Sequence, residues 1–321
     1  MGLLVNGEWH TDWYDTEKSG GRFVRPDAGF RHWIEPSPDA EFPAAADRYH
    51  LYISLACPWA SRALIFRKLK GLEEIVGLSI VDPFMGDDGW FFSDYPGSIP
   101  DSVNGFHFLR ELYTRAKPDY TGRVSVPVLW DKQKNTIVNN ESSEIIRMFN
   151  SAFDALGATP VDYYPEALRA EIDAINSLVY DNVNNGVYKA GFATSQGAYE
   201  EAAQALFDTL DQLEARLGRQ RYLVGHAITE ADWRLLTTLV RFDAVYYGHF
   251  KCNVRQLRDY PNLWNYCRDL YQMPGIAETV DLDHIKQHYY RSQPTINPTR
   301  IVPVGPEIDF SAPHDRAAKF G

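Results

Sequence analysis

The first part of the chain alternates between strand-like and helix-like patterns of apolar residues. Over residues 49–53 apolar Tyr, Leu and Ile occupy every second position, which is typical of a β-strand. Pro58 is followed by apolar residues at helical spacing and predicts a helix over 58–70, because proline favours the first position of a helix. Residues 75–82 predict a second strand. Strand, helix and strand in this order form a βαβ unit, whose two strands are parallel.

A long connection separates this unit from a second set of strands. Residues 83–123 predict an insertion with a short helix over 106–116, because connections of this length usually carry structure or function of their own. Strands are expected over 124–130 and 136–139, joined by a tight turn and therefore antiparallel. A helix over 142–149 completes the pattern.

Beyond about residue 160 the apolar pattern is helical throughout. Leucines and other apolar residues recur at spacings of three and four over 199–217, which predicts an amphipathic helix. Thr229 followed by Asp232 predicts the capped start of another helix. The remaining helices are expected over 168–183, 263–271 and 276–288.

These patterns predict an α/β domain followed by an all-α domain. Prolines interrupt any periodic pattern over residues 1–46, which we therefore expect to form an irregular extension. The α/β domain is placed at 47–155 and contains the insertion. The all-helical domain is placed at 160–291, and a proline-rich tail at 292–321.

Composition and charge exclude several classes of function. The 321 residues carry a formal net charge of −11, which disfavours binding to the phosphates of nucleic acids. No stretch approaches the roughly 18 uncharged apolar residues of a membrane-spanning helix, and no secretory signal is evident. The chain has three cysteines, a small and odd number that does not fit a disulfide framework. We therefore expect a cytoplasmic protein that binds neither nucleic acid nor membranes.

Cys57 is the residue with the clearest chemical signal. It lies between the end of a predicted strand and the first turn of a helix, where the helix dipole favours a thiolate and lowers the pKa of the thiol. The alternative is a buried, inert cysteine. Position 60 is alanine, so the C-x-x-C frame of dithiol oxidoreductases lacks its second sulfur. Such a site forms a mixed disulfide with an external thiol, and glutathione is the abundant cytosolic candidate.

Two later segments fit a glutathione molecule. Val126–Pro127 is expected to be a cis peptide before a strand, with the main chain of Val126 available to an extended peptide. Glu141–Ser142 opens a helix, where a carboxylate can accept from an ammonium group and the helix start can bind a carboxylate. Read alone, this pair is equally a helix cap. Arg123 is a candidate partner for the second carboxylate of glutathione.

Several longer segments carry a resemblance to a known family. They are Cys57–Ala60, Arg67–Leu72, Gly89–Trp90, Val126–Asp131, Asn140–Ser142, Tyr180–Ala193, Arg241–Asp243 and Tyr271–Thr279. In these segments, which are distributed over nearly the whole chain, the sequence resembles the glutathionyl-hydroquinone reductases, the Xi-class glutathione transferases. The resemblance extends to bacterial members that act on chlorinated glutathionyl-hydroquinones. Ser61 departs from the family pattern, where many relatives have histidine.

This resemblance implies a thioredoxin-like domain, an all-α glutathione-transferase domain and a homodimer. It assigns Cys57 as the nucleophile, with glutathione as co-substrate. It places Trp90, Arg123, Val126, Glu141 and Ser142 around glutathione, and Tyr188, Tyr246 and Tyr289 around the quinol. From the residues alone these tyrosines are equally core aromatics. The choice of Tyr246 over Tyr247, and of Tyr289 over Tyr290, rests on the family pattern.

The implied reaction is the reduction of a glutathionyl-hydroquinone to a hydroquinone. Cys57 attacks the glutathionyl sulfur, and a second glutathione resolves the mixed disulfide to give oxidised glutathione. Phenolic donors of the pocket stabilise the charge on the departing ring. Two alternatives stay open: a broader thiol transferase or dehydroascorbate reductase with the same nucleophile, and a non-catalytic glutathione-transferase-like binding module.

The remaining cysteines and histidines give weaker signals. Cys252 and Cys267 lack a following proline or helix start and are expected to be structural. Together with His249, His284 and His288 they are candidates for a zinc site, because His284 and His288 lie at i, i+4 spacing. No C-x-x-C accompanies them, so we expect no metal.

Overall fold

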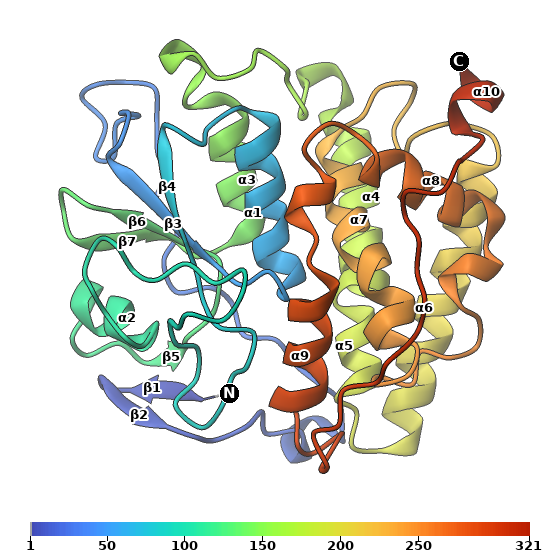
Figure 1. Cartoon of the computed structure of the whole chain (residues 1–321), viewed down its shortest axis with the longest axis horizontal. Coiled ribbons are helices and arrows are strands. Elements are labelled where there is room, and N and C mark those ends of the chain that lie inside the picture. The colour runs from blue at the N-terminus through green and yellow to red at the C-terminus, as the bar shows by residue number, and fades with distance from the viewer. Residues whose placement is uncertain (1) are drawn as a thin grey trace. The chain divides into compact units, whose positions relative to one another are not determined.

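The structure is a computed structural model that describes residues 2–321, and these fall into two compact units (Figure 1). The first unit contains the chain up to Trp13, Pro26–Val161 and Asp283–Ser292. The second contains Tyr14–Arg25, Asp162–Leu282 and Gln293–Gly321. Each unit therefore takes residues from separate stretches of the chain, whereas the sequence suggested consecutive domains.

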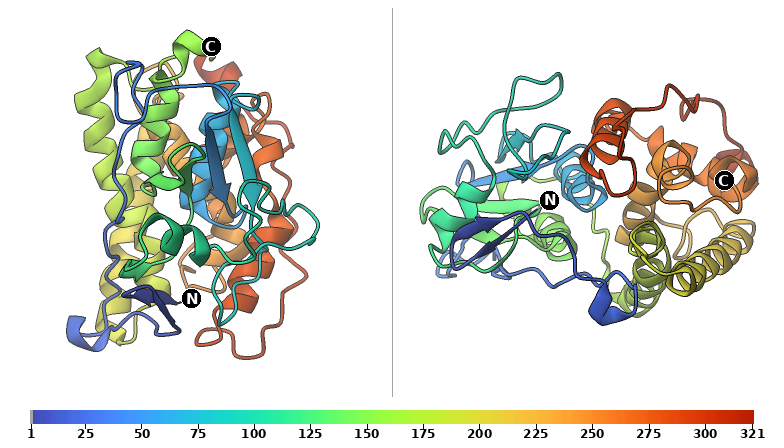
Figure 2. Two further views of the ribbon diagram at one scale, coloured as in Figure 1. Left: turned by 90° about the vertical axis from the view of Figure 1, so that its left-hand side faces the viewer. Right: turned by 90° about the horizontal axis from the view of Figure 1, so that it is seen from below.

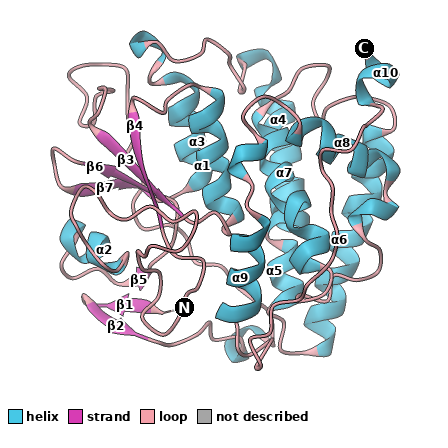
Figure 3. Ribbon diagram, viewed as in Figure 1, coloured by secondary structure: helices cyan, strands magenta, loops and turns pink. Residues whose placement is uncertain are grey.

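The first unit is built on a mixed sheet with the strand order β4-β3-β6-β7 (Figure 3). Its strands are β3 (Tyr49–Ile53), β4 (Val76–Ile80), β6 (Val128–Asp131) and β7 (Thr136–Asn139). β3 and β4 are parallel, and β6 pairs antiparallel with both β3 and β7. Helix α1 (Pro58–Leu69) connects the parallel pair, so the predicted βαβ unit is confirmed. Helix α3 (Ser142–Ser151) packs beside α1, and the Val126–Pro127 peptide is cis, as expected.

The N-terminal extension is more regular than predicted. Strands β1 (Leu3–Val5) and β2 (Glu8–His10) form a hairpin, and β1 also pairs with the short strand β5 (Gly122–Arg123). The hairpin is dark blue in Figure 2. Its turn residues Asn6 and Gly7 both have positive φ, 49° and 81°, as the favoured two-residue hairpin turns require. Strands of three residues are too short for the alternating pattern to reveal them.

The insertion contains helix α2 (Arg110–Ala116), which begins four residues later than predicted. Before it, the carboxylate of Asp101 accepts hydrogen bonds from the main chain at residues 103, 104 and 106. The Glu111 carboxylate accepts from the main-chain N–H groups of His107 and Phe108 at 3.0 and 2.7 Å. These bonds hold residues 101–108 in turns, and the helix starts only after them.

The second unit is helical, as predicted. Its helices are α4 (Arg169–Val179), α5 (Gly186–Gly191), α6 (Gln196–Leu217), α7 (Glu230–Arg241), α8 (Pro261–Tyr271) and α10 (Arg316–Phe320). The predicted capping box at Thr229 and Asp232 is present at the start of α7. Five-residue π-helical segments follow α4 and α7, over Tyr180–Asn184 and Phe242–Tyr246. Such segments often occur at functional sites, and no sequence signal marked them.

The helix predicted over 276–288 is wrong in position. Residues Ala277–Thr279 form a single 3₁₀ turn, and α9 spans Leu282–Ser292. The break falls at Val280, whose extended backbone (φ −118°, ψ 115°) ends the turn. No glycine or proline marks this break, so the apolar pattern appeared continuous. Residues Asp283–Ser292 belong to the first unit rather than to the helical one.

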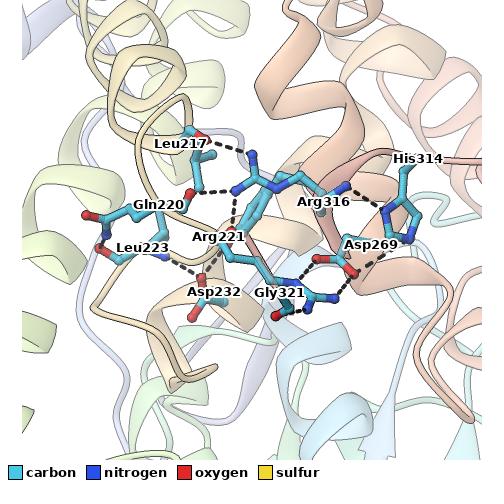
Figure 4. A network of polar contacts seen from close by, with 10 residues as sticks. Leu217, Gln220, Arg221, Leu223, Asp232, Asp269, His314, Arg316 and Gly321 are labelled. Carbon is cyan, nitrogen blue, oxygen red and sulfur yellow. Dashed lines mark hydrogen bonds and ion pairs between the residues drawn. The ribbon is translucent and has the colours of Figure 1, made fainter. Parts of the chain in front are cut away.

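A buried arginine fixes the end of the chain (Figure 4). Arg316 is fully buried and donates to the carbonyl oxygens of Leu217 at 2.7 Å, Gln220 at 2.6 Å and Arg221. Leu217 is the last residue of α6, so the guanidinium satisfies a carbonyl that the helix leaves unpaired. Arg221 in turn forms a two-bond ion pair with Asp269 of α8, both bonds being 2.9 Å.

Candidate active site

Cys57 occupies the N-cap position of α1, directly after the loop that follows β3, with Pro58 as the first helical residue. Its side chain is half-buried and its Sγ lies 3.6 Å from the carbonyl oxygen of Val126. The N-terminus of a helix favours an anion, so this position suits a thiolate. The sequence-based placement of Cys57 at a helix start is therefore confirmed.

The other two cysteines differ from Cys57 in every respect that matters for reactivity. Cys252 and Cys267 are both fully buried, and burial raises the pKa of both thiols. The residue at position 60 of α1 is alanine, also fully buried. Cys57 is thus the thiol most accessible for chemistry, and alanine occupies the position of the second sulfur of a C-x-x-C frame.

Glu141 and Ser142 open helix α3, as the sequence suggested. Glu141 is the N-cap residue, and its Oε1 accepts hydrogen bonds from the N–H and the Oγ of Ser143 at 2.9 and 2.8 Å. Its own N–H donates to Oδ1 of Asn139 at 2.7 Å. The Oγ of Ser142 is buried and accepts from Arg62 at 3.4 Å. The helix-cap role of Glu141 is present in the structure, and the role in ligand binding stays a prediction.

Arg123 and Trp90 lie in the insertion of the first unit. The Arg123 guanidinium donates to the main-chain carbonyls of Asp12 and Trp13, the latter at 2.7 Å, and so ties the N-terminal segment to β5. Trp90 is buried and stacks on the imidazole of His288, with ring centroids 4.7 Å apart and an interplanar angle of 21°. From the sequence His288 is only a candidate zinc ligand, and this stacking was not predicted.

Two of the three predicted quinol residues share an aromatic cluster in the second unit. The rings of Tyr188, in α5, and Tyr246, in the π-helical segment, have centroids 6.1 Å apart. The Arg25 guanidinium lies 4.9 Å from the Tyr188 ring centroid and donates to Asn185 at 3.0 Å. No feature of the sequence pointed to Arg25.

The two members of each adjacent tyrosine pair differ in burial. Tyr246 is fully buried and Tyr247 half-buried. Tyr289 lies on α9 in the first unit and is buried, whereas Tyr290 is half-buried. Burial also raises the pKa of Tyr290. Burial alone does not assign a tyrosine to a pocket, so the role of all three stays a prediction.

Comparison with known proteins identifies the family of the chain. Residues 56–152 match the family model described as glutathione S-transferase, N-terminal domain, and residues 196–269 match that of the C-terminal domain. The chain is 57% identical to the glutathionyl-hydroquinone reductase YqjG of Escherichia coli, over all of both chains. It is 56% identical to the glutathionyl-hydroquinone reductase PcpF of Sphingobium chlorophenolicum, over 95% of this chain and 96% of that one.

Similarity to solved structures indicates the class of glutathione transferase. The glutathione-bound structure of YqjG from Escherichia coli superposes with a TM-score of 0.92 at 54% identity, covering 99% of this chain and 100% of that one. A Xi-class glutathione transferase from Natrialba magadii gives a TM-score of 0.93 at 51% identity, covering 99% and 97%. The chain belongs to the Xi class of glutathione transferases. The thioredoxin-like and all-α domains expected from the sequence are those of this class.

In this Xi-class chain, helix α9 holds the part of the insertion that carries Trp90. The side chains of α9 that bind this loop are Asp283 to the Tyr95 hydroxyl (2.6 Å), His284 to the Pro96 carbonyl (2.7 Å), His288 to the Pro83 carbonyl (3.0 Å) and Ser292 to the Met85 N–H (2.9 Å). Each histidine donates to a carbonyl oxygen. His284 and His288, the i, i+4 pair considered as zinc ligands, therefore form hydrogen bonds to the loop.

Two further observations bear on cofactors and location. Within residues 2–321, no group of three or more histidine, cysteine, aspartate or glutamate side chains is arranged to hold a metal ion. None of the helices in the same residues combines the length and apolar character needed to cross a bilayer.

Proposed function

We propose that this Xi-class transferase reduces glutathionyl-hydroquinones to hydroquinones with glutathione as co-substrate. The observation that carries the proposal is the half-buried Cys57 at the start of α1, with alanine at position 60 and the other cysteines fully buried. A site with one reactive sulfur cannot close an internal disulfide, so the second sulfur must come from a thiol in solution. The names of the two curated bacterial relatives supply the substrate class.

Glutathione is proposed to bind in an extended form along the Cys57 loop. The main chain of Val126, whose carbonyl lies 3.6 Å from Sγ, would pair with the peptide backbone of the ligand. The γ-glutamyl end would meet the start of α3, with its ammonium on Glu141 and its carboxylate at Ser142. Arg123 would contribute to binding the glycyl carboxylate, and Trp90 would border the ligand.

The reaction then proceeds in two balanced steps. In the first, the Cys57 thiolate attacks the glutathionyl sulfur, a disulfide forms, and the bond from sulfur to the ring carbon breaks. The electron pair of that bond leaves with the ring. The ring is a good leaving group only in its keto tautomer, because the negative charge is then delocalised as an enolate. Protonation of the enolate gives the hydroquinone. In the second, a glutathione thiolate attacks the disulfide, which releases oxidised glutathione and restores the Cys57 thiolate.

The tyrosines would serve the first of these steps. Hydroxyl donors directed at the developing enolate oxygen stabilise it in a site from which water is excluded. We assign this role to Tyr188, Tyr246 and Tyr289. It explains why a quinol pocket would need several phenols rather than one general acid.

The test is the Cys57→Ala variant, assayed for glutathione-dependent release of hydroquinone. We expect no turnover above the uncatalysed rate, and turnover equal to that of the wild type would refute the mechanism. Intact mass of the wild type treated with oxidised glutathione should show one glutathione adduct, located at Cys57 by peptide mapping.

The same assay separates the alternative of a general thiol transferase. A dedicated reductase turns over a glutathionyl-hydroquinone far faster than a small disulfide or dehydroascorbate, whereas a thiol transferase shows the reverse order. Comparing unsubstituted with chlorinated glutathionyl-hydroquinones then defines the preferred ring. We further propose a cytoplasmic homodimer. The absence of disulfides among the three cysteines within residues 2–321 is in keeping with a reducing compartment, and light scattering of the purified protein would measure its mass.

A further inference from the structure

One buried hydroxyl group joins the two segments that we propose to hold glutathione. Tyr113 of α2 is fully buried, and its hydroxyl donates to the carbonyl oxygen of Ser125 at 2.7 Å. The same oxygen accepts hydrogen bonds from the N–H of Ser125 and from Nδ2 of Asn140, both at 3.2 Å. A phenol has one donor and two acceptor positions, so these three bonds use its full capacity.

On one side, this hydroxyl fixes the approach to the Val126 peptide. Ser125 lies before the start of β6 at Val128, so the sheet does not hold it. Both of its main-chain groups are instead bound by the single Tyr113 hydroxyl. The next residue is Val126, whose carbonyl oxygen lies 3.6 Å from Sγ of Cys57. The position of this carbonyl therefore depends on a side chain from the insertion.

On the other side, the hydroxyl fixes the start of α3. Asn140 directly precedes Glu141, the N-cap residue. The Oδ1 and the N–H of Asn140 bond to the N–H and the carbonyl of Phe30 at 3.0 and 3.1 Å. The other polar atom of its side chain, Nδ2, bonds to the Tyr113 hydroxyl. Asn140 is held from two directions, and the direction facing Ser125 is supplied by Tyr113.

We propose that Tyr113 is a positioning residue that sets the distance between the Val126 main chain and the Glu141–Ser142 helix start. This proposal rests on the glutathione site proposed above. A tripeptide that contacts both segments at once binds more tightly when their spacing is fixed, because binding then does not have to order the two segments. A shorter thiol that contacts only the Val126 segment binds equally well whether or not this spacing is fixed. Tyr113 thus sets the preference for glutathione over thiols without a γ-glutamyl group.

The test compares glutathione with cysteinylglycine, which lacks the γ-glutamyl group, as the resolving thiol. For each protein, kcat/KM is measured for both thiols at a saturating concentration of the same glutathionyl-hydroquinone. The two thiols differ in intrinsic reactivity, but this difference is identical for all variants. A change in the ratio of the two kcat/KM values therefore reports on the protein alone.

Tyr113→Phe removes only the hydroxyl group. We expect the loss of the fixed spacing to weaken the interaction with glutathione by about the contribution of one hydrogen bond. The ratio of kcat/KM for glutathione to kcat/KM for cysteinylglycine should therefore fall about tenfold. Tyr49→Phe is the matched control, because the buried Tyr49 hydroxyl also donates to a main-chain carbonyl at 2.7 Å, that of Pro43. Tyr49 begins β3, at the other end of the strand from Cys57. Its variant should keep the wild-type ratio.

The outcomes are distinct. A ratio in Tyr113→Phe equal to that of the wild type, or equal losses with both thiols, would overturn the proposal and leave Tyr113 with a structural role. If Tyr113→Phe does not fold, Asn140→Ala removes the same link from the other side and must lower the ratio; an unchanged ratio there overturns the proposal as well. A wild type without glutathione-dependent activity would instead refute the proposed function itself.

Discussion

Glu141 combines two roles that substitution can separate. Its carboxylate caps α3 through bonds of 2.9 and 2.8 Å to Ser143, and we propose that it also accepts a hydrogen bond from the ammonium group of glutathione. Asparagine is a favoured N-cap residue but carries no charge, whereas alanine neither caps nor attracts an ammonium. Glu141→Asn therefore removes the second role and keeps the first, and Glu141→Ala removes both.

The two roles of Glu141 contribute different amounts of free energy. Loss of a cap costs about 1 kcal/mol, and this lowers the Tm by about 2–4 °C in a chain longer than 150 residues. A hydrogen bond to a charged group contributes about 1.5–3 kcal/mol, roughly 10- to 150-fold in Kd. Because Glu141 is half-exposed, solvent screening favours the lower end, about tenfold. We expect both variants to bind glutathione about tenfold more weakly and only Glu141→Ala to lose stability.

Calorimetric titration with S-methylglutathione, which cannot react with Cys57, measures the Kd without turnover. Scanning calorimetry of the same samples measures the Tm. An analogue that lacks the amino group should bind equally to wild type and both variants, because it has no ammonium for Glu141 to bind. A wild-type Kd for S-methylglutathione in Glu141→Asn would refute the assignment and leave Glu141 as a helix cap.

Three further predictions follow from the burial of particular groups. In the native protein iodoacetamide should alkylate Cys57 and leave Cys252 and Cys267 unmodified until denaturant is added, because burial raises the pKa of those two thiols; mass spectrometry of the native sample counts the modified sites. Arg316→Ala leaves the end of α6 without its buried donor and should lower the free energy of unfolding by about 3 kcal/mol in urea titrations, and a loss below about 1 kcal/mol would contradict this. Burial lowers the pKa of His50 from 6.5 to about 4. Between these two pH values the unfolded chain binds a proton at His50 that the folded chain does not bind. The contribution of His50 to the free energy of unfolding is therefore unaffected above pH 6.5 and falls by roughly 3 kcal/mol towards pH 4. His50→Gln should flatten this decline in urea titrations at pH 7 and 4.5, and an unchanged slope would contradict the assignment.

The parts of the site that depend on local sequence could be predicted. Cys57 follows a strand and precedes Pro58, and these neighbours alone determine that it lies at a helix start. The cap at Glu141 is likewise formed with a residue two positions away, and the Val126–Pro127 peptide, expected to be cis from its proline and the following strand, is cis. Each of these features was identified because its signal and its structure occupy the same short stretch of chain.

The contacts that hold these segments in place could not be predicted. Tyr113 meets Ser125 and Asn140 across 12 and 27 positions, and nothing in its neighbourhood distinguishes it from other buried tyrosines. His288 and Pro83 are 205 positions apart. Such contacts follow from the tertiary fold, and the helical spacing of His284 and His288 gave no indication of the carbonyl oxygens that they bind.

The assignment of α9 to the first unit has a consequence for synthesis of the protein. A chain leaves the ribosome from its N-terminus, and its domains usually fold in that order. Here the first unit lacks the helix that holds the Trp90 loop until Asp162–Leu282 have been translated. We therefore expect the nascent chain to acquire a complete first unit only once residues 283–292 have been translated, after most of the second unit. A recombinant fragment that ends at Val161 would keep Cys57 but not this loop anchor, and a circular permutant that places 283–292 next to the first unit would restore it.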